Sequence, residues 1–132
     1  MTLMNSNQNI SAIETFLHGL FKSVSENTFV GRLPETIKNG WTDMVLIDCD
    51  NGVYDYDAYG SGTVLLFLYA KPMAGGQKNV KKLKEMENAV KAIIESSGST
   101  NDYYIYRRRT YSDYDYSRNW HCNVVLIGIT AK

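Results

Sequence analysis

The chain has 132 residues and a formal net charge of zero, from 14 basic and 14 acidic residues. This length fits one domain over residues 1–132, with a core that needs no metal or disulfide. The balanced charge gives no global field that would favour nucleic acid or an anionic membrane. Two cysteines, Cys49 and Cys122, are too few for a disulfide framework, so we expect thiols in a reducing compartment.

The first periodic segment follows a polar stretch over residues 1–8, which we expect to be disordered and which carries no secretion signal. Ser11 and Glu14 then have the spacing of a capping box at the start of a helix. Apolar residues recur every three or four positions, which predicts an amphipathic helix with one apolar stripe: Ile10, Ile13, Phe16, Leu17, Leu20, Phe21 and Val24.

Residues 25–42 form a connector that we expect to be irregular, because Pro34 and the pair Asn39-Gly40 interrupt regular structure. Connectors of this length are often functional. Its apolar residues should anchor it to the core: Phe29, Val30, Leu33, Ile37 and Trp41.

Two strand-like runs, residues 44–50 and 53–59, flank Asn51-Gly52. Asn-Gly between such runs is a strong hairpin signal, because both residues tolerate the positive φ of a type I′ turn. The next run, residues 63–70, is apolar at almost every position, which predicts a central strand covered on both faces.

A second helix is expected from Lys78 to about Ser97, ended by Gly98. Its inner stripe would be Val80, Leu83, Met86, Val90, Ile93 and Ile94. The chain then closes with a long hairpin, with strands over 102–111 and 120–130 and a polar turn near 112–117.

The expected order is therefore α-β-β-β-α-β-β, an α+β fold whose mainly antiparallel sheet of about five strands carries two helices on one face. The residues expected to be largely buried are Phe16, Leu20, Leu66, Leu68, Leu83, Val90, Ile94, Val125 and Ile127.

No segment carries a catalytic, cofactor-binding or metal-binding signature. The run from Asp48 to Gly52 lacks the glycine and glutamate spacing of a calcium loop, so a hairpin turn is favoured. His121 and Cys122 are adjacent on a strand and point to opposite faces, which leaves Cys49 with His121 as a remote alternative for a nucleophilic pair. Gly75-Gly76 precedes a helix without a phosphate-binding motif. We therefore expect no enzyme activity.

The segment Tyr103–Tyr111 is the most informative stretch, because it combines four tyrosines with the three consecutive arginines Arg107, Arg108 and Arg109. Aromatic and arginine side chains on one strand can stack on bases and pair with phosphates. The same two residue types are enriched in protein interfaces. A solvated strand with local ion pairs to Asp113 and Asp115 is the third interpretation.

The order of elements resembles that of tail terminator and tail-completion proteins of long-tailed bacteriophages, including head–tail joining proteins. The resemblance covers Ile10 to Thr130 and is carried by element order, length and hydrophobic rhythm. Its landmarks are the connector Phe29–Pro34, the strand Leu65–Ala70, the helix Leu83–Ile94 and the final strand Val124–Ile129.

The resemblance implies a structural subunit that forms a ring, commonly of six, at the junction of tail and neck. Its partners would be copies of itself, the tail tube and neck proteins, with no membrane. The expected location is the virion, assembled in the host cytoplasm, or otherwise the cytoplasm. The alternative function is a module that binds single-stranded nucleic acid through the hairpin from Tyr103 to Tyr116, which we call the Tyr/Arg hairpin.

A ring needs two different patches that complement each other. Our own hypothesis pairs the Tyr/Arg hairpin of one subunit with the expected acidic hairpin, Asp48 to Tyr59, of the next, since opposite charges favour one register. The candidate interface residues are Tyr104, Tyr106, Arg107, Arg108, Arg109, Tyr111, Tyr114 and Tyr116 on the first side, and Asp48, Asp50, Asp55 and Asp57 on the second.

Overall fold

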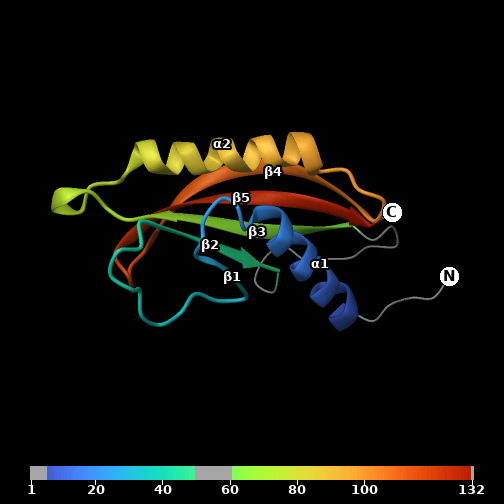
Figure 1. Cartoon of the computed structure of the whole chain (residues 1–132), viewed down its shortest axis with the longest axis horizontal. Coiled ribbons are helices and arrows are strands. Elements are labelled where there is room, and N and C mark those ends of the chain that lie inside the picture. The colour runs from blue at the N-terminus through green and yellow to red at the C-terminus, as the bar shows by residue number, and fades with distance from the viewer. Residues whose placement is uncertain (1–5, 50–60, 132) are drawn as a thin grey trace.

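The computed structural model describes residues 6–49 and 61–131 and has the expected α+β class (Figure 1). The order of elements agrees with α-β-β-β-α-β-β, with a short 3₁₀ turn before the second helix. The elements are α1 (Ser6–Phe21), β1 (Thr28–Val30), β2 (Asp43–Asp48), β3 (Ser61–Ala70), η1 (Ala74–Gly76), α2 (Val80–Ser97), β4 (Tyr103–Asp115) and β5 (Trp120–Ala131).

The five strands form one sheet in the order β1-β2-β3-β5-β4. β1 runs parallel to β2, and the other neighbours are antiparallel, so the sheet is mainly antiparallel as expected. β3 lies in the middle and pairs with β5 from Ser61↔Thr130 to Ala70↔His121. Its two-sided apolar sequence is explained by this central position.

Along each strand, side chains alternate between the two faces of the sheet. One face is covered by the helices and the other by a loop; we call them the helix face and the loop face. On the helix face, α1 and α2 pack against the cluster that contains Val45, Leu66 and Ile127. On the loop face, residues 31–42 cover part of a second cluster through Leu33, Ile37 and Trp41. Figure 1 shows α2 on one side of the sheet and this loop on the other. Both helices therefore lie on one face, as the sequence predicts.

Two expectations for the first half of the chain need correction, and a third falls on residues outside the described ranges. α1 begins at Ser6, so Ser11 lies inside the helix and does not cap it. The connector contains β1, whose three residues are too short for a periodic signal, and Gly31 ends it at a φ of 85°. The turn Asn51-Gly52 and the strand expected over 53–59 lie outside the described residues; β2 has β1 on one side and β3 on the other.

The terminal hairpin is confirmed, but its turn is shorter and later than expected. β4 continues to Asp115, and the connection to Trp120 takes only four residues. Asp115 organises this turn: its carbonyl accepts from the Asn119 amide at 2.7 Å, and its carboxylate accepts from the Ser117 and Arg118 amides. Local hydrogen bonds of this kind compete with strand pairing, which explains why the strand ends at Asp115 and the turn begins there.

Most of the predicted core is buried. Six of the nine residues are 0–1% exposed: Leu66, Leu68, Leu83, Val90, Val125 and Ile127. Phe16, Leu20 and Ile94 are half-buried at the rim of the helix-face cluster. Val80 was expected in the inner stripe of α2 but is 64% exposed, because it lies in the first turn.

Candidate interaction surface

The Tyr/Arg segment forms most of β4, which lies at one edge of the sheet. The beginning of this edge is covered by the chain that follows α2: the Ile105 amide donates to the Gly98 carbonyl at 2.7 Å, and the Thr100 amide donates to the Tyr103 carbonyl at 2.8 Å. Within the described residues, no segment pairs with the outer side of 106–115. Ten residues of strand edge are therefore available to a partner.

Two tyrosines of β4 point to the loop face. Tyr106 is opposite Gly128, and its ring occupies the space where a Cβ of that glycine would lie. Tyr104 is opposite Thr130 and stacks on Tyr106 with ring centroids 5.7 Å apart. Tyr104 is 48% exposed and Tyr106 is 37% exposed. The absence of a side chain at Gly128 on β5 therefore leaves room for an aromatic pair that remains accessible to a partner.

The arginines are divided by a bulge between Arg107 and Arg109. A bulge adds one residue to a strand and redirects the side chains that follow. Arg108 donates to the Thr63 hydroxyl at 2.7 Å, and the Arg109 guanidinium lies 5.8 Å from the ring centre of Tyr111. Thr63, Arg108, Arg109 and Leu126 line a hollow of about 450 Å³ on the loop face.

The tip of the hairpin is also aromatic. Tyr114 contacts Tyr116 and His121 edge-on, with centroids 4.9 and 4.7 Å apart. Tyr116 is 84% exposed, whereas Tyr114 is half-buried. Arg118 bonds Asp115 at 3.0 Å and the Pro34 carbonyl at 2.9 Å, which ties the tip to the connector loop.

Of the acidic candidate residues, only Asp48 is described; Asp50, Asp55 and Asp57 lie outside the described residues. Asp48 is 5% exposed and lines a cavity of about 380 Å³ on the loop face, together with Tyr69 and Arg118. Burial raises the pKa of Tyr69 well above its usual value. The pairing of an acidic hairpin with the Tyr/Arg hairpin stays a prediction.

His121 forms a nucleophilic pair with neither cysteine. Cys122 points to the loop face, while His121 contacts the Gly76 carbonyl at 3.1 Å and Tyr114, as strand alternation predicts. Asp48, next to Cys49, is opposite Leu65, whereas His121 is opposite Ala70, five positions along β3. Cys49 is one position further away, so at about 3.4 Å per residue it is separated from His121 by roughly 20 Å, and the remote alternative is wrong.

Cys122 itself is a poor nucleophile. Burial raises the pKa of its thiol to about 12, and the negative charges of Asp113 and Asp115 act in the same direction. The side chain is 2% exposed. Both cysteines are buried thiols, on opposite faces of the sheet.

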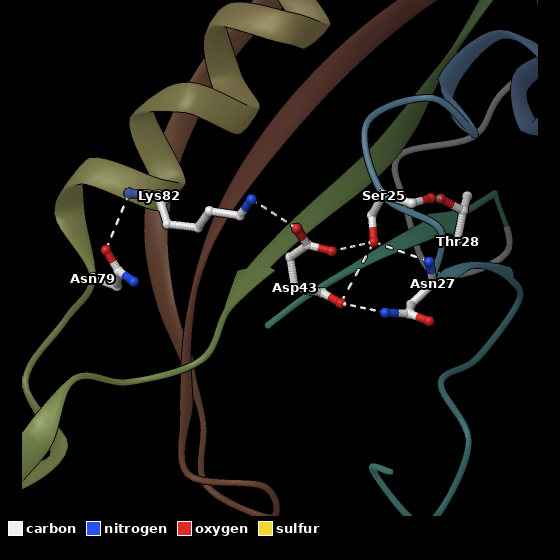
Figure 2. Close-up of polar contacts among 6 residues, drawn as sticks. All are labelled: Ser25, Asn27, Thr28, Asp43, Asn79 and Lys82. Carbon is white, nitrogen blue, oxygen red and sulfur yellow. Dashed lines mark hydrogen bonds and ion pairs between the residues drawn. The ribbon is translucent and has the colours of Figure 1, made fainter. Parts of the chain in front are cut away.

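A polar cluster that sequence reasoning missed joins the α1–β1 loop to β2 and α2 (Figure 2). One carboxylate oxygen of Asp43 accepts from the Ser25 hydroxyl, and the other lies 2.9 Å from the Lys82 ammonium. The Asp43 carbonyl accepts from the Asn27 side-chain amide at 3.0 Å. These residues are far apart in the sequence and share no motif, so no sequence signal could have brought them together.

This cluster has the geometry of a structural clamp. The Ser25 side chain is 5% exposed, and its hydroxyl also accepts from the Asn27 amide at 3.0 Å. A serine nucleophile needs an adjacent base and access to substrate. Here the hydroxyl is held between a carboxylate and a backbone amide beneath the surface.

The described ranges, 6–49 and 61–131, also bear on metal binding and on membrane insertion. They contain no group of three histidine, cysteine, aspartate or glutamate side chains placed to hold a metal ion. No helix in them combines the length and the apolar character needed to cross a membrane. The sequence matches no protein-family model, and no curated protein matches it.

Proposed function

We propose that this protein is a non-enzymatic structural subunit, similar to phage tail terminator or tail-completion proteins, that forms a ring through the Tyr/Arg hairpin at the junction of tail and neck. The observation that carries this proposal is the edge of β4. A strand of 13 residues is more than twice the usual length, and exposed edges of this kind attract other strands.

The side chains of the hairpin support a protein contact. Tyr104, Tyr106 and Tyr111 each expose more than a third of their surface beside Arg107 and Arg109. Tyrosine and arginine are the residues that most often dominate binding energy in interfaces.

A second candidate is a module that binds single-stranded nucleic acid. The stacked pair Tyr104–Tyr106 and the nearby Arg108 and Arg109 share the loop face, and exposed aromatic rings beside cations can stack on bases. The lysines argue against it: Lys81 and Lys84 lie on α2, in the other layer, and Lys82 is paired with Asp43. A binder would gather these charges on one face.

The test compares two variants with the same change in charge. Replacing Arg107, Arg108 and Arg109 with glutamate should abolish ring assembly, measured by sedimentation over a wide concentration range with and without tail tubes. The control replaces Lys81, Lys84 and Lys91, all exposed on α2, with glutamate and should assemble like the parent. Circular dichroism checks that both variants fold.

Other outcomes decide between the candidates. If the arginine variant assembles like the parent, the hairpin is not the ring contact. If the parent binds single-stranded oligonucleotides at micromolar concentration or tighter, and added salt weakens this binding steeply, the nucleic-acid candidate replaces the structural one.

A further inference from the structure

The free edge of β4 has a self-complementary sequence. Around Tyr111, positions at equal distance on either side carry matching side chains: Thr110 with Ser112, and Arg109 with Asp113. From this pattern we infer that two copies of the chain associate through their β4 edges, antiparallel, about a two-fold axis at Tyr111.

The geometry of antiparallel strands restricts the possible registers. A two-fold axis normal to the sheet keeps each side chain on its own face, and opposed residues of an antiparallel pair share a face. The axis must therefore pass through a residue and not between two. Arg109, Tyr111 and Asp113 are opposite Leu126, Val124 and Cys122, so all three point to the loop face and can meet their counterparts there.

Charge selects Tyr111 as the central residue. An axis at Tyr111 places the exposed Arg109 opposite the exposed Asp113 twice in each dimer. An axis at Ser112 would place Arg109 opposite Asp115, which is already paired with Arg118 at 3.0 Å. An axis at Thr110 would place Arg109 opposite Tyr111. Opposite charges across strands stabilise a pair and like charges destabilise it, so one register is preferred.

The rest of the edge limits the contact to this region. Gly98 and Thr100 already occupy the edge near Tyr103 and Ile105. The bulge between Arg107 and Arg109 interrupts regular pairing on that side, and the turn begins after Asp115 on the other. The regular edge from 109 to 115 has the length of an average strand, which is enough for a specific pairing.

This inference concerns the free protein and does not rest on the proposed role in a tail. A two-fold contact closes after two copies and cannot by itself build a ring. In a ring-forming subunit, the β4 edge would exchange its partner on assembly.

Cysteine cross-linking tests the position of the axis. With Tyr111→Cys, the new thiol faces its own copy at a distance that suits a disulfide, so mild oxidation should give a covalent dimer. Tyr104→Cys is the matched control: Tyr104 is 48% exposed against 39% for Tyr111 but lies off the axis, and it should give several-fold less dimer. Arg109→Cys and Asp113→Cys should cross-link when mixed and not when oxidised separately.

Charge exchange tests the pairing in solution by sedimentation equilibrium. The parent should sediment at twice the chain mass of 15.0 kDa at high concentration. Arg109→Asp or Asp113→Arg alone should weaken the dimer about tenfold, because each change places like charges opposite each other twice. The double exchange should restore the parent affinity, since the two sites face each other only about this axis.

Three results would overturn the inference: a parent that stays monomeric at the highest concentration, a Tyr111→Cys dimer yield no greater than that of Tyr104→Cys, or a double exchange as weak as the single variants. A dimer that never forms rings on tail tubes would leave the inference standing and remove the proposed function. If rings form on tail tubes but Tyr111→Cys gives no cross-linked dimer, the proposed function stands and this inference is wrong.

Discussion

The two faces of the sheet contrast in how they are covered. The helix face is sealed by α1 and α2, and its cluster is continuous from Val45 on β2 to Ile105 on β4. The loop face is covered by residues 31–42 over only part of its area, and the remainder carries Tyr104, Tyr106 and Arg109. Stability should therefore depend mainly on the helix face, and recognition on the uncovered part of the loop face.

Adjacent leucines on β3 provide the largest test of this contrast. Leu66 points to the helix face and is 1% exposed, whereas its neighbour Leu65 points to the loop face and is half-buried. Leu66→Ala should lower the free energy of unfolding by roughly 2–5 kcal/mol, because a sealed site leaves a cavity. Leu65→Ala should cost about 1 kcal/mol.

Urea denaturation of the two variants measures both values under the same conditions. Equal losses would mean that the loop face is as well packed as the helix face. The comparison between the faces would then be wrong.

The helix face was also the part that the sequence predicted best. Periodicity of 3.6 in the helices and an apolar run in β3 identify buried residues because burial itself creates these patterns. β1 was missed because three residues cannot show a period, and its parallel pairing with β2 depends on contacts distant in sequence. The turn at Asp115 was misplaced because side-chain hydrogen bonds, and not composition, decide where it starts.

The candidate surface was predicted in part. The tyrosines and arginines of β4 were identified from residue type alone, and they are exposed except for the half-buried Tyr103 and Tyr114. Two features could not be predicted, because both depend on the register with β5. They are the bulge between Arg107 and Arg109 and the packing of the Tyr106 ring over Gly128. The self-complementary edge became visible only once β4 was placed at the margin of the sheet.

The polar clamp at Asp43 gives an intermediate test, because it fastens α2 to the sheet without apolar contacts. Asp43→Ala should lower the free energy of unfolding by about 1–3 kcal/mol, since the buried Ser25 hydroxyl loses its acceptor. Lys82→Met is the matched control and should cost less than about 1 kcal/mol, because the Lys82 side chain is 32% exposed. If both variants lower the free energy of unfolding by the same amount, the stability of the clamp comes from the ion pair between Lys82 and Asp43 and not from the buried Ser25 hydroxyl.

The smallest effect concerns the alkaline stability of the loop face. Cys122 has a folded pKa of about 12, above the ordinary value of 9.0, because burial and then Asp113 and Asp115 disfavour the thiolate. A raised folded pKa means that the unfolded chain loses its proton first. The stability that Cys122 contributes is therefore complete below pH 9 and is lost as the pH rises toward 12. Tyr69, on the same face, also has a raised pKa and adds a loss in the same direction above pH 10.

Urea denaturation between pH 8 and pH 11 separates these contributions. The parent should lose stability with rising pH, Cys122→Ala should lose less than the parent from pH 9 upward, and Tyr69→Phe should differ in slope only above pH 10. Each slope is compared with the parent, so that exposed lysines and tyrosines, common to all three proteins, cancel. A Cys122→Ala profile parallel to that of the parent would show that the thiol keeps an ordinary pKa, and that the loop face admits water where Cys122 lies.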